Sequence, residues 1–121
     1  MENKTLLFEG AGWNGAEHNG VGNCRIRTRI KNKDSRIIYF EAAKMGSGIN
    51  IGRVNHCFDM QDEKNNRTKD LSYIERLNFP YTHEGILSLI NEHLNCDFTE
   101  IKVIYEGLRV HANKEPICSC Q

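Results

Sequence analysis

Apolar and polar residues alternate most clearly over Cys24–Lys33. Ile26, Thr28 and Ile30 occupy one set of positions, and arginine or lysine occupies the positions between them. A period of two is the pattern of a β-strand, whose side chains point alternately to opposite faces of a sheet. The segment therefore predicts a strand with one β-branched face and one wholly cationic face.

A returning strand is predicted over Arg36–Ala43, directly after the turn residues 32–35. The two strands would form a hairpin whose register is fixed by their faces, because a slip of one residue would place Glu41 beside Ile26. Matching apolar positions also places a carboxylate and a tyrosine opposite arginines, and both are favourable cross-strand neighbours. The predicted pairs are Ile30 with Ile38, Thr28 with Phe40, Ile26 with Ala42, Arg27 with Glu41 and Arg29 with Tyr39.

Three further strands are predicted from apolar runs on either side of this hairpin. They are expected over Lys4–Phe8, over Ile49–Met60 and over Ile101–His111. The second run carries Val54, His56, Phe58 and Met60 at alternate positions, so these side chains are expected to share a face. The third is apolar on both faces, which predicts that both are covered.

Two helices complete the expected elements, one over Asp70–Leu77 and one over His83–Leu94 with Thr82 as its N-cap. The glycine-rich Gly10–Asn23 and the wholly polar segment 61–70 are expected to be loops. Strands joined mainly by turns predict an α+β fold. We expect an antiparallel sheet of about five strands with two helices, the C-terminal helix packing on the sheet.

The size and charge of the chain narrow its possible functions. At 121 residues and 13.9 kDa it is expected to form a single domain, 1–121. Sixteen Lys and Arg balance sixteen Asp and Glu, whereas a general nucleic-acid binder usually has a basic excess. Any contact with a polyanion must therefore come from a local patch. No run approaches the ~18 apolar residues of a membrane span, and the N-terminal segment lacks the apolar core of a signal peptide.

The five cysteines are odd in number and follow no small-disulfide framework. They predict reduced thiols and a cytosolic protein. Together with nearby histidines, such as His56 and His93, they supply enough atoms for a tetrahedral zinc site, but none has a paired C-x-x-C spacing. Free thiols are therefore the preferred interpretation, and neither a metal nor another cofactor is predicted.

The cationic strand face is the main candidate for ligand binding. Its residues Arg25, Arg27 and Arg29 would stand about 6.6–6.8 Å apart along the strand. Guanidinium groups suit planar, bidentate contacts with phosphate oxygens. The alternative is a solvated outer face in which Arg27 pairs with Glu41. The neutral net charge favours a small phosphate-bearing ligand over a long nucleic acid.

Other candidates are scattered along the chain. Gly10–Gly15 matches G-x-G-x-x-G, but no helix can open on it, so the dinucleotide-binding interpretation is rejected. Trp13 in this segment could stack on a ligand, or the segment could be a plain loop. Phe79 precedes a helix N-terminus, where a phosphate would be favoured, yet it could equally pack in the core. Asn91 on that helix could read a base edge or meet water, and Arg109 on an apolar strand needs an anionic partner.

No catalytic motif is present: the sequence has no serine elbow, no H-E-x-x-H and no P-loop or kinase signature. An enzyme remains an alternative, because a constellation assembled in three dimensions needs no local motif.

Four segments, LLFEGAGWNG, RIRTRI, NFPYTHEGILSLINEHL and YEGLRVHANK, together resemble the first type of phage anti-Thoeris protein. The resemblance runs over most of the chain. It implies a non-catalytic protein that binds cyclic ADP-ribose isomers made by bacterial TIR-domain proteins, in the cytoplasm of the infected host. It also implies binding of cyclic oligonucleotides at a separate site, and assembly as dimers or hexamers.

The resemblance also implies roles for individual residues. The aromatic stacker of the family matches Phe79, its phosphate-contacting arginine matches Arg109, and its helix amide matches Asn91. Trp13 would be a second aromatic. Tight capture of so small a ligand requires extensive enclosure, which favours a pocket between protomers. The alternatives are an enzyme that degrades the signal and a protein-binding inhibitor that acts through an exposed sheet face.

Overall fold

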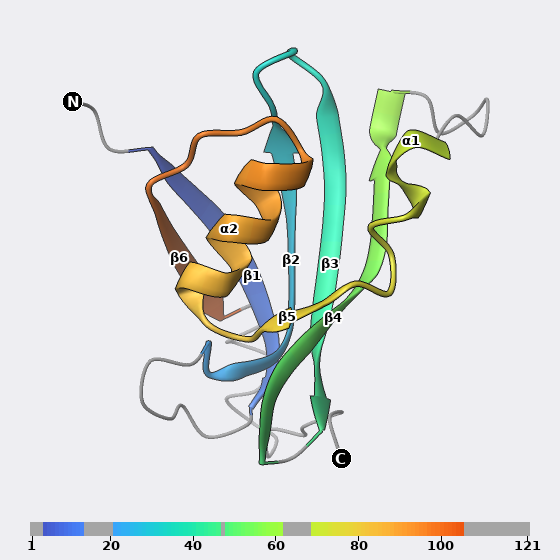
Figure 1. Cartoon of the computed structure of the whole chain (residues 1–121). Helices are drawn as coiled ribbons and strands as arrows, with labels where there is room; N and C mark the ends of the chain where they lie inside the picture. The colour runs from blue at the N-terminus through green and yellow to red at the C-terminus, as the bar shows by residue number, and fades with distance from the viewer. Residues whose placement is uncertain (1–3, 14–20, 47, 62–68, 106–121) are drawn as a thin grey trace.

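The computed structural model describes residues 4–13, 21–46, 48–61 and 69–105. These residues form one curled, six-stranded sheet with a helix lying across one of its faces (Figure 1). The elements in chain order are β1 (Thr5–Trp13), β2 (Asn23–Lys31), β3 (Ile37–Gly46), β4 (Ile49–Asp59), α1 (Lys69–Ser72), β5 (Asn78–Pro80), α2 (His83–His93) and β6 (Glu100–Tyr105). Across the sheet the strands follow the order β5-β4-β3-β2-β1-β6.

The α+β class and the packing of the last helix on the sheet are confirmed, but the number and direction of the elements differ from those expected. The sheet has six strands rather than five, and it is mixed because β6 runs parallel to β1. Between β5 and β6 the chain crosses the sheet as α2 (Figure 1). Because α2 connects β5 to β6, these two strands do not form a hairpin. Strand β6 can therefore reach the other side of the sheet and pair with β1 in the parallel direction.

The hairpin of β2 and β3 has the register that the sequence predicts. Ile30 pairs with Ile38, Thr28 with Phe40, Ile26 with Ala42, Arg27 with Glu41 and Arg29 with Tyr39. The apolar positions face the core, where Ile30 and Phe40 are fully buried. The arginines consequently lie on the opposite face, which we call the outer face, away from α2.

The helix predicted over Asp70–Leu77 is wrong for most of its length, since α1 has only four residues. The segment after it pairs with β4 instead of continuing the helix. The Arg76 N–H donates to the Val54 carbonyl at 2.7 Å, and the Val54 N–H donates to the Leu77 carbonyl at 3.0 Å. Within the segment the remaining bonds are those of turns, which reach back three residues, as from the Ile74 N–H to the Leu71 carbonyl at 2.9 Å.

Helix α2 covers the core face of the sheet and begins where predicted. The Thr82 side chain accepts from the Gly85 N–H at 3.0 Å, as an N-cap should. Ile86 and Ile90 on the helix are fully buried against the sheet. The core that they join also contains Phe8, Ile26, Ile30, Phe40, Val54, Ile74, Phe79 and Tyr81.

In β4 the predicted face is wrong beyond Val54. Glu41 pairs with His56 while Ala42 pairs with Val54, so the strand carries one extra residue there. Such a bulge reverses the alternation of faces. Cys57 rather than His56 is therefore buried, together with Val54.

The predictions for the first and the last strand also need correction. Strand β1 does not end at Phe8 but continues through Gly10, whose lack of a side chain admits a neighbour: a Cβ there would lie 2.5 Å from the Asn23 side chain. In β6 the outer positions are not covered by the described residues, because the Ile104 side chain is 42% exposed. The residues of the predicted last strand after Tyr105 lie outside the described residues.

The cysteines are not uniformly reduced as expected. Cys57 and Cys96 are free and buried, whereas Cys24 is disulfide-bonded. Neither helix in the described part of the chain has the length and apolar character needed to cross a bilayer.

Candidate functional site

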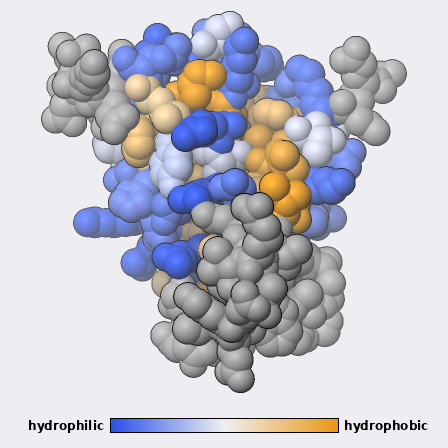
Figure 2. Space-filling view, turned by 180° about the vertical axis from the view of Figure 1, so that it is seen from behind, coloured by the Kyte–Doolittle hydropathy of each residue, from blue (hydrophilic) through white to orange (hydrophobic). Residues whose placement is uncertain are grey.

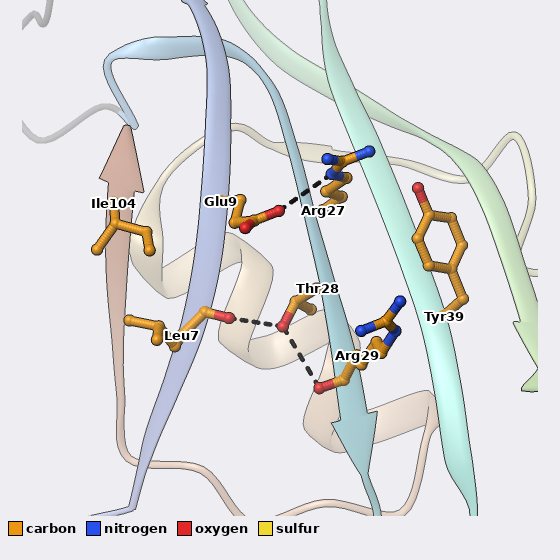
Figure 3. A pocket seen from close by; sticks show the side chains of 7 residues that line it. All are labelled: Leu7, Glu9, Arg27, Thr28, Arg29, Tyr39 and Ile104. Carbon is orange, nitrogen blue, oxygen red and sulfur yellow. Dashed lines mark hydrogen bonds and ion pairs between the residues drawn. The ribbon is translucent and has the colours of Figure 1, made fainter. Parts of the chain in front are cut away.

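A pocket of about 350 Å³ opens on the outer face of the sheet where β1, β2, β3 and β6 lie side by side (Figure 3). We call it the outer-face pocket. It combines two arginines, a carboxylate and an aromatic ring with aliphatic side chains at one side. Its lining residues are Leu7, Glu9, Arg27, Thr28, Arg29, Tyr39 and Ile104.

The arginines reach this pocket because of the period-two pattern of β2. Arg25, Arg27 and Arg29 are all exposed on the outer face, whereas Ile26 and Ile30 between and beside them are buried. The structure therefore brings together the three arginines that the sequence singled out. Arg27 and Arg29 line the pocket. Arg25, two residues before Arg27 in β2, is on the same face but not among the lining residues.

The pocket lies where the pairing between β1 and β2 ends. Their paired residues run from Trp13 with Asn23 to Glu9 with Arg27. Two residues before Glu9 in β1, the Leu7 carbonyl accepts a hydrogen bond of 2.6 Å from the Thr28 hydroxyl (Figure 3). A side chain thus satisfies a backbone acceptor that a regular ladder would pair with a backbone N–H.

Arg27 is held by a carboxylate from the neighbouring strand. Its Nε donates to Glu9 Oε1 at 3.2 Å, and both side chains are about half exposed, at 46% and 50%. On the other side of the arginines, the Tyr39 hydroxyl donates to Glu41 at 2.7 Å. Burial and the contact with Glu41 raise the pKa of Tyr39, so this hydroxyl stays protonated at neutral pH.

Arg29 differs from Arg27 in its surroundings. Within the described ranges, no carboxylate pairs with the guanidinium of Arg29 or with that of Arg25. Arg29 lies beside Tyr39 in the hairpin register and its side chain lies next to the ring in Figure 3. An exposed guanidinium beside an aromatic ring can bind a phosphate and stack on a planar group.

Phe79 and Asn91 do not reach the outer-face pocket. Phe79 is only 5% exposed and packs in the core, with its ring centroid 6.1 Å from that of Tyr81. Asn91 donates to the Phe98 carbonyl at 2.9 Å and accepts from the Phe98 N–H at 3.0 Å. Both residues lie on the helix side of the sheet, so the residues that the resemblance implies are not assembled with the arginines.

The two remaining candidates are only partly placed. Trp13 ends β1, and its backbone position pairs with Asn23. Its side chain lies outside the described residues, as does the whole of Arg109.

Several pocket residues were not singled out from the sequence. Tyr39 could have been, because the predicted register already placed it opposite Arg29. Glu9 was missed because the first strand was expected to end at Phe8; alternation continued by one residue puts Glu9 on the same face as Leu7. Ile104 was missed because the last strand was expected to be covered on both faces.

A second, smaller pocket of about 330 Å³ lies at the other end of β1, near the turn between β2 and β3. Its lysines are Lys4, Lys31 and Lys33, and Lys4 is paired with Asp97 at 2.9 Å. Among the described residues that line it, Phe98 supplies the aromatic ring, and this side chain is half-buried. The outer-face pocket is therefore the stronger candidate for binding a nucleotide.

The described residues contain no group of three or more His, Cys, Asp or Glu side chains placed to hold a metal ion. Figure 2 views the molecule from the side of the outer face, and the part of that face not covered by grey residues shows hydrophobic side chains in separate groups between hydrophilic ones. Such a surface suits reversible binding of a ligand with both polar and apolar parts.

Comparisons with protein-family models, with curated proteins and with solved structures find no match to this chain.

Proposed function

We propose that this protein is a non-catalytic binder that captures cyclic ADP-ribose isomers in the cytoplasm of an infected bacterium. By sequestering the signal made by TIR-domain proteins, it would block antiphage defence. The ligand class comes from the resemblance of the sequence to anti-Thoeris proteins. The observation that supports it most is the placement of Arg27, Arg29 and Tyr39 around one pocket.

The three side chains offer complementary contacts for a nucleotide. Arg29 and Arg27 can bind phosphate oxygens through charge-assisted hydrogen bonds, which are about twice as strong as neutral ones. The ring of Tyr39 can stack on adenine, and the aliphatic Leu7 and Ile104 can cover the remaining apolar surface. Binding without turnover needs only these contacts.

The size of the pocket bears on how the ligand is enclosed. At about 350 Å³ it lies at the low end of the ~300–1,000 Å³ typical of small-molecule sites, and it is open on one side. Tight capture would require more of the ligand surface to be covered. We therefore propose a homodimer or hexamer, in which a second protomer closes the pocket over the exposed Leu7 and Ile104.

Calorimetric titration tests the proposal, with a panel of cyclic ADP-ribose isomers and a cyclic trinucleotide as ligands. We expect Arg29→Ala to weaken binding by about 10- to 100-fold, because a charged hydrogen bond is lost. Arg53→Ala is the matched control, since Arg53 is an exposed arginine of β4 outside the pocket. No heat with any ligand would overturn the proposal.

Recovery of the bound ligand distinguishes capture from degradation. After heat denaturation, chromatography should return the cyclic ligand intact and in the amount bound. Appearance of a linear product would instead favour the enzyme alternative.

The protein-binding alternative is favoured by a separate observation. Met45, Ile49 and Ile51 are 43–48% exposed where the β3–β4 hairpin turns. Exposed apolar side chains gathered in one place are a common feature of protein interfaces. A host protein retained by the wild type and lost with Ile49→Ser, in the absence of any small ligand, would favour this alternative.

A further inference from the structure

The outer-face pocket contains a carboxylate that a simple phosphate site would not need. Glu9 lines the pocket next to the arginines, and its Oε1 accepts from Arg27 Nε at 3.2 Å (Figure 3). A carboxylate repels a ligand phosphate, and it also competes with that phosphate for Arg27. Because of its position in the pocket, Glu9 would therefore influence which ligands bind there.

The charges of the lining residues limit how much negative charge the pocket can accept. Arg27 and Arg29 carry two positive charges and Glu9 carries one negative charge, which leaves a single net positive charge. Tyr39 is neutral, and its hydroxyl donates to Glu41, a carboxylate of β3 that is not among the lining residues. Such a balance suits phosphodiesters, with one charge per phosphate, better than terminal phosphomonoesters, with close to two.

The chemistry of Glu9 points to what it can bind. A carboxylate is an acceptor only, and hydroxyl groups are its natural neutral donors. The ribose hydroxyls of nucleotides are bound by Asp or Glu in this way in dinucleotide-binding proteins. The Glu9–Arg27 pair is half exposed, so screening by water makes it weak enough for a ligand to separate.

We propose that Glu9 is a specificity-determining residue, which makes the outer-face pocket select ribose-containing phosphodiesters and reject terminal phosphomonoesters. A ligand phosphate takes Arg27, and Glu9, released from the ion pair, accepts hydrogen bonds from ribose hydroxyls. This inference rests on the proposed function for the identity of the site, but it assigns a ligand class and a selecting group that the proposed function does not contain.

Three probes test it by titration against the wild type and Glu9→Gln: the dinucleotides ApA and dApdA, and AMP. ApA and dApdA differ in their sugar hydroxyls, and AMP carries a terminal phosphomonoester. We expect the wild type to prefer ApA over dApdA by about 10-fold and to bind AMP more weakly than ApA. Glu9→Gln should lose the preference between the dinucleotides and gain about 10-fold in affinity for AMP, because a repelling charge is removed.

Glu92→Gln is the control, since Glu92 is an exposed carboxylate on α2, on the other side of the sheet. It should leave all three affinities unchanged. Equal affinities of wild type and Glu9→Gln for each probe would overturn the inference, and so would parallel loss of all three in Glu9→Gln or absence of binding to either protein. Cyclic ADP-ribose is titrated separately: if it fails to bind while the dinucleotide preference is found, the proposed function fails and the role of Glu9 stands.

Discussion

The side-chain amide of Asn91 is bonded to the backbone of Phe98 at both of its ends. Nδ2 donates to the Phe98 carbonyl at 2.9 Å, and Oδ1 accepts from the Phe98 N–H at 3.0 Å. These two bonds tie the C-terminal half of α2 to the segment that leads into β6. An amide used in this way stabilises the fold, and the adjacent donor and acceptor with which it could bind a base edge in bidentate fashion are already used by Phe98.

Asn91→Ala is therefore expected to act on stability. Loss of these bonds leaves the backbone groups of a half-buried residue without their partner, which should lower the free energy of unfolding by about 1–3 kcal/mol. Urea denaturation followed by circular dichroism measures the change, with Glu92→Ala as an exposed control on the same helix. Unchanged stability together with lost nucleotide binding would instead place the amide in a ligand site.

Gly85→Ala tests the close packing at the start of α2. Alanine is favoured over glycine inside a helix by about 1 kcal/mol, but a Cβ at Gly85 would fall on the carbonyl oxygen of Pro80. Because the obstacle is backbone and cannot rotate away, we expect a net loss of stability of about 1–2 kcal/mol. Thermal unfolding should show a lower Tm for this variant and no decrease for Ser88→Ala, an exposed position of the same helix. A higher Tm for Gly85→Ala would contradict the close contact.

The two free cysteines are expected to resist alkylation in the folded protein. Burial, and to a smaller extent the charge of Glu75, raises the pKa of Cys57 to about 12. Burial and the charge of Asp97 raise the pKa of Cys96 to about 11. At pH 8 both thiols therefore remain protonated and unreactive. Mass spectrometry after iodoacetamide treatment should find them unlabelled in buffer and labelled in urea; rapid labelling of either in buffer would contradict this.

The ion pair between Lys4 and Asp97 predicts one contribution to acid sensitivity. The hydrogen bond from Lys4 holds the pKa of Asp97 below its usual value. A carboxyl group with a depressed pKa binds fewer protons in the folded than in the unfolded state. Its stabilising effect is thus present above the unfolded pKa of about 4 and is lost as the pH falls through the folded pKa.

Lys4→Met should accordingly make stability less dependent on pH in that acidic range. Urea unfolding of the wild type and Lys4→Met at a series of pH values from neutral to acid measures it. The two proteins should differ at neutral pH and converge at the acid end. A constant difference at every pH would show that Lys4 acts through packing of its aliphatic chain alone.

The parts of the fold that the sequence predicts are those set by neighbouring residues. The register of β2 with β3 follows from alternation on both strands, and α2 follows from its apolar stripe and its cap at Thr82. The extra residue at Asn55 has no such local signal, because it depends on how β4 meets β3. The faces of β4 beyond that point could therefore not be derived from alternation.

The candidate site is predictable to a similar extent. The arginines of β2 are found together on the outer face because one strand carries them all. Glu9 and Ile104 come from strands whose neighbours in the sheet are distant in sequence, and periodicity carries no information about that pairing. The sequence allowed Phe79 either to stack on a ligand or to pack in the core. The pairing of β5 with β4 places it over Gly52, and it therefore packs in the core.

The parallel pairing of β1 with β6 has a consequence for the order of folding. It joins Thr5 to Glu100 and Gly10 to Tyr105, so the loop that must close between them contains most of the chain. The β2–β3–β4 meander needs only short loops and should form first, since loop-closure entropy delays contacts between distant residues. During synthesis, one edge of β1 should therefore stay unpaired until β6 has left the ribosome, and this interval is when the chain is most exposed to mispairing between strands.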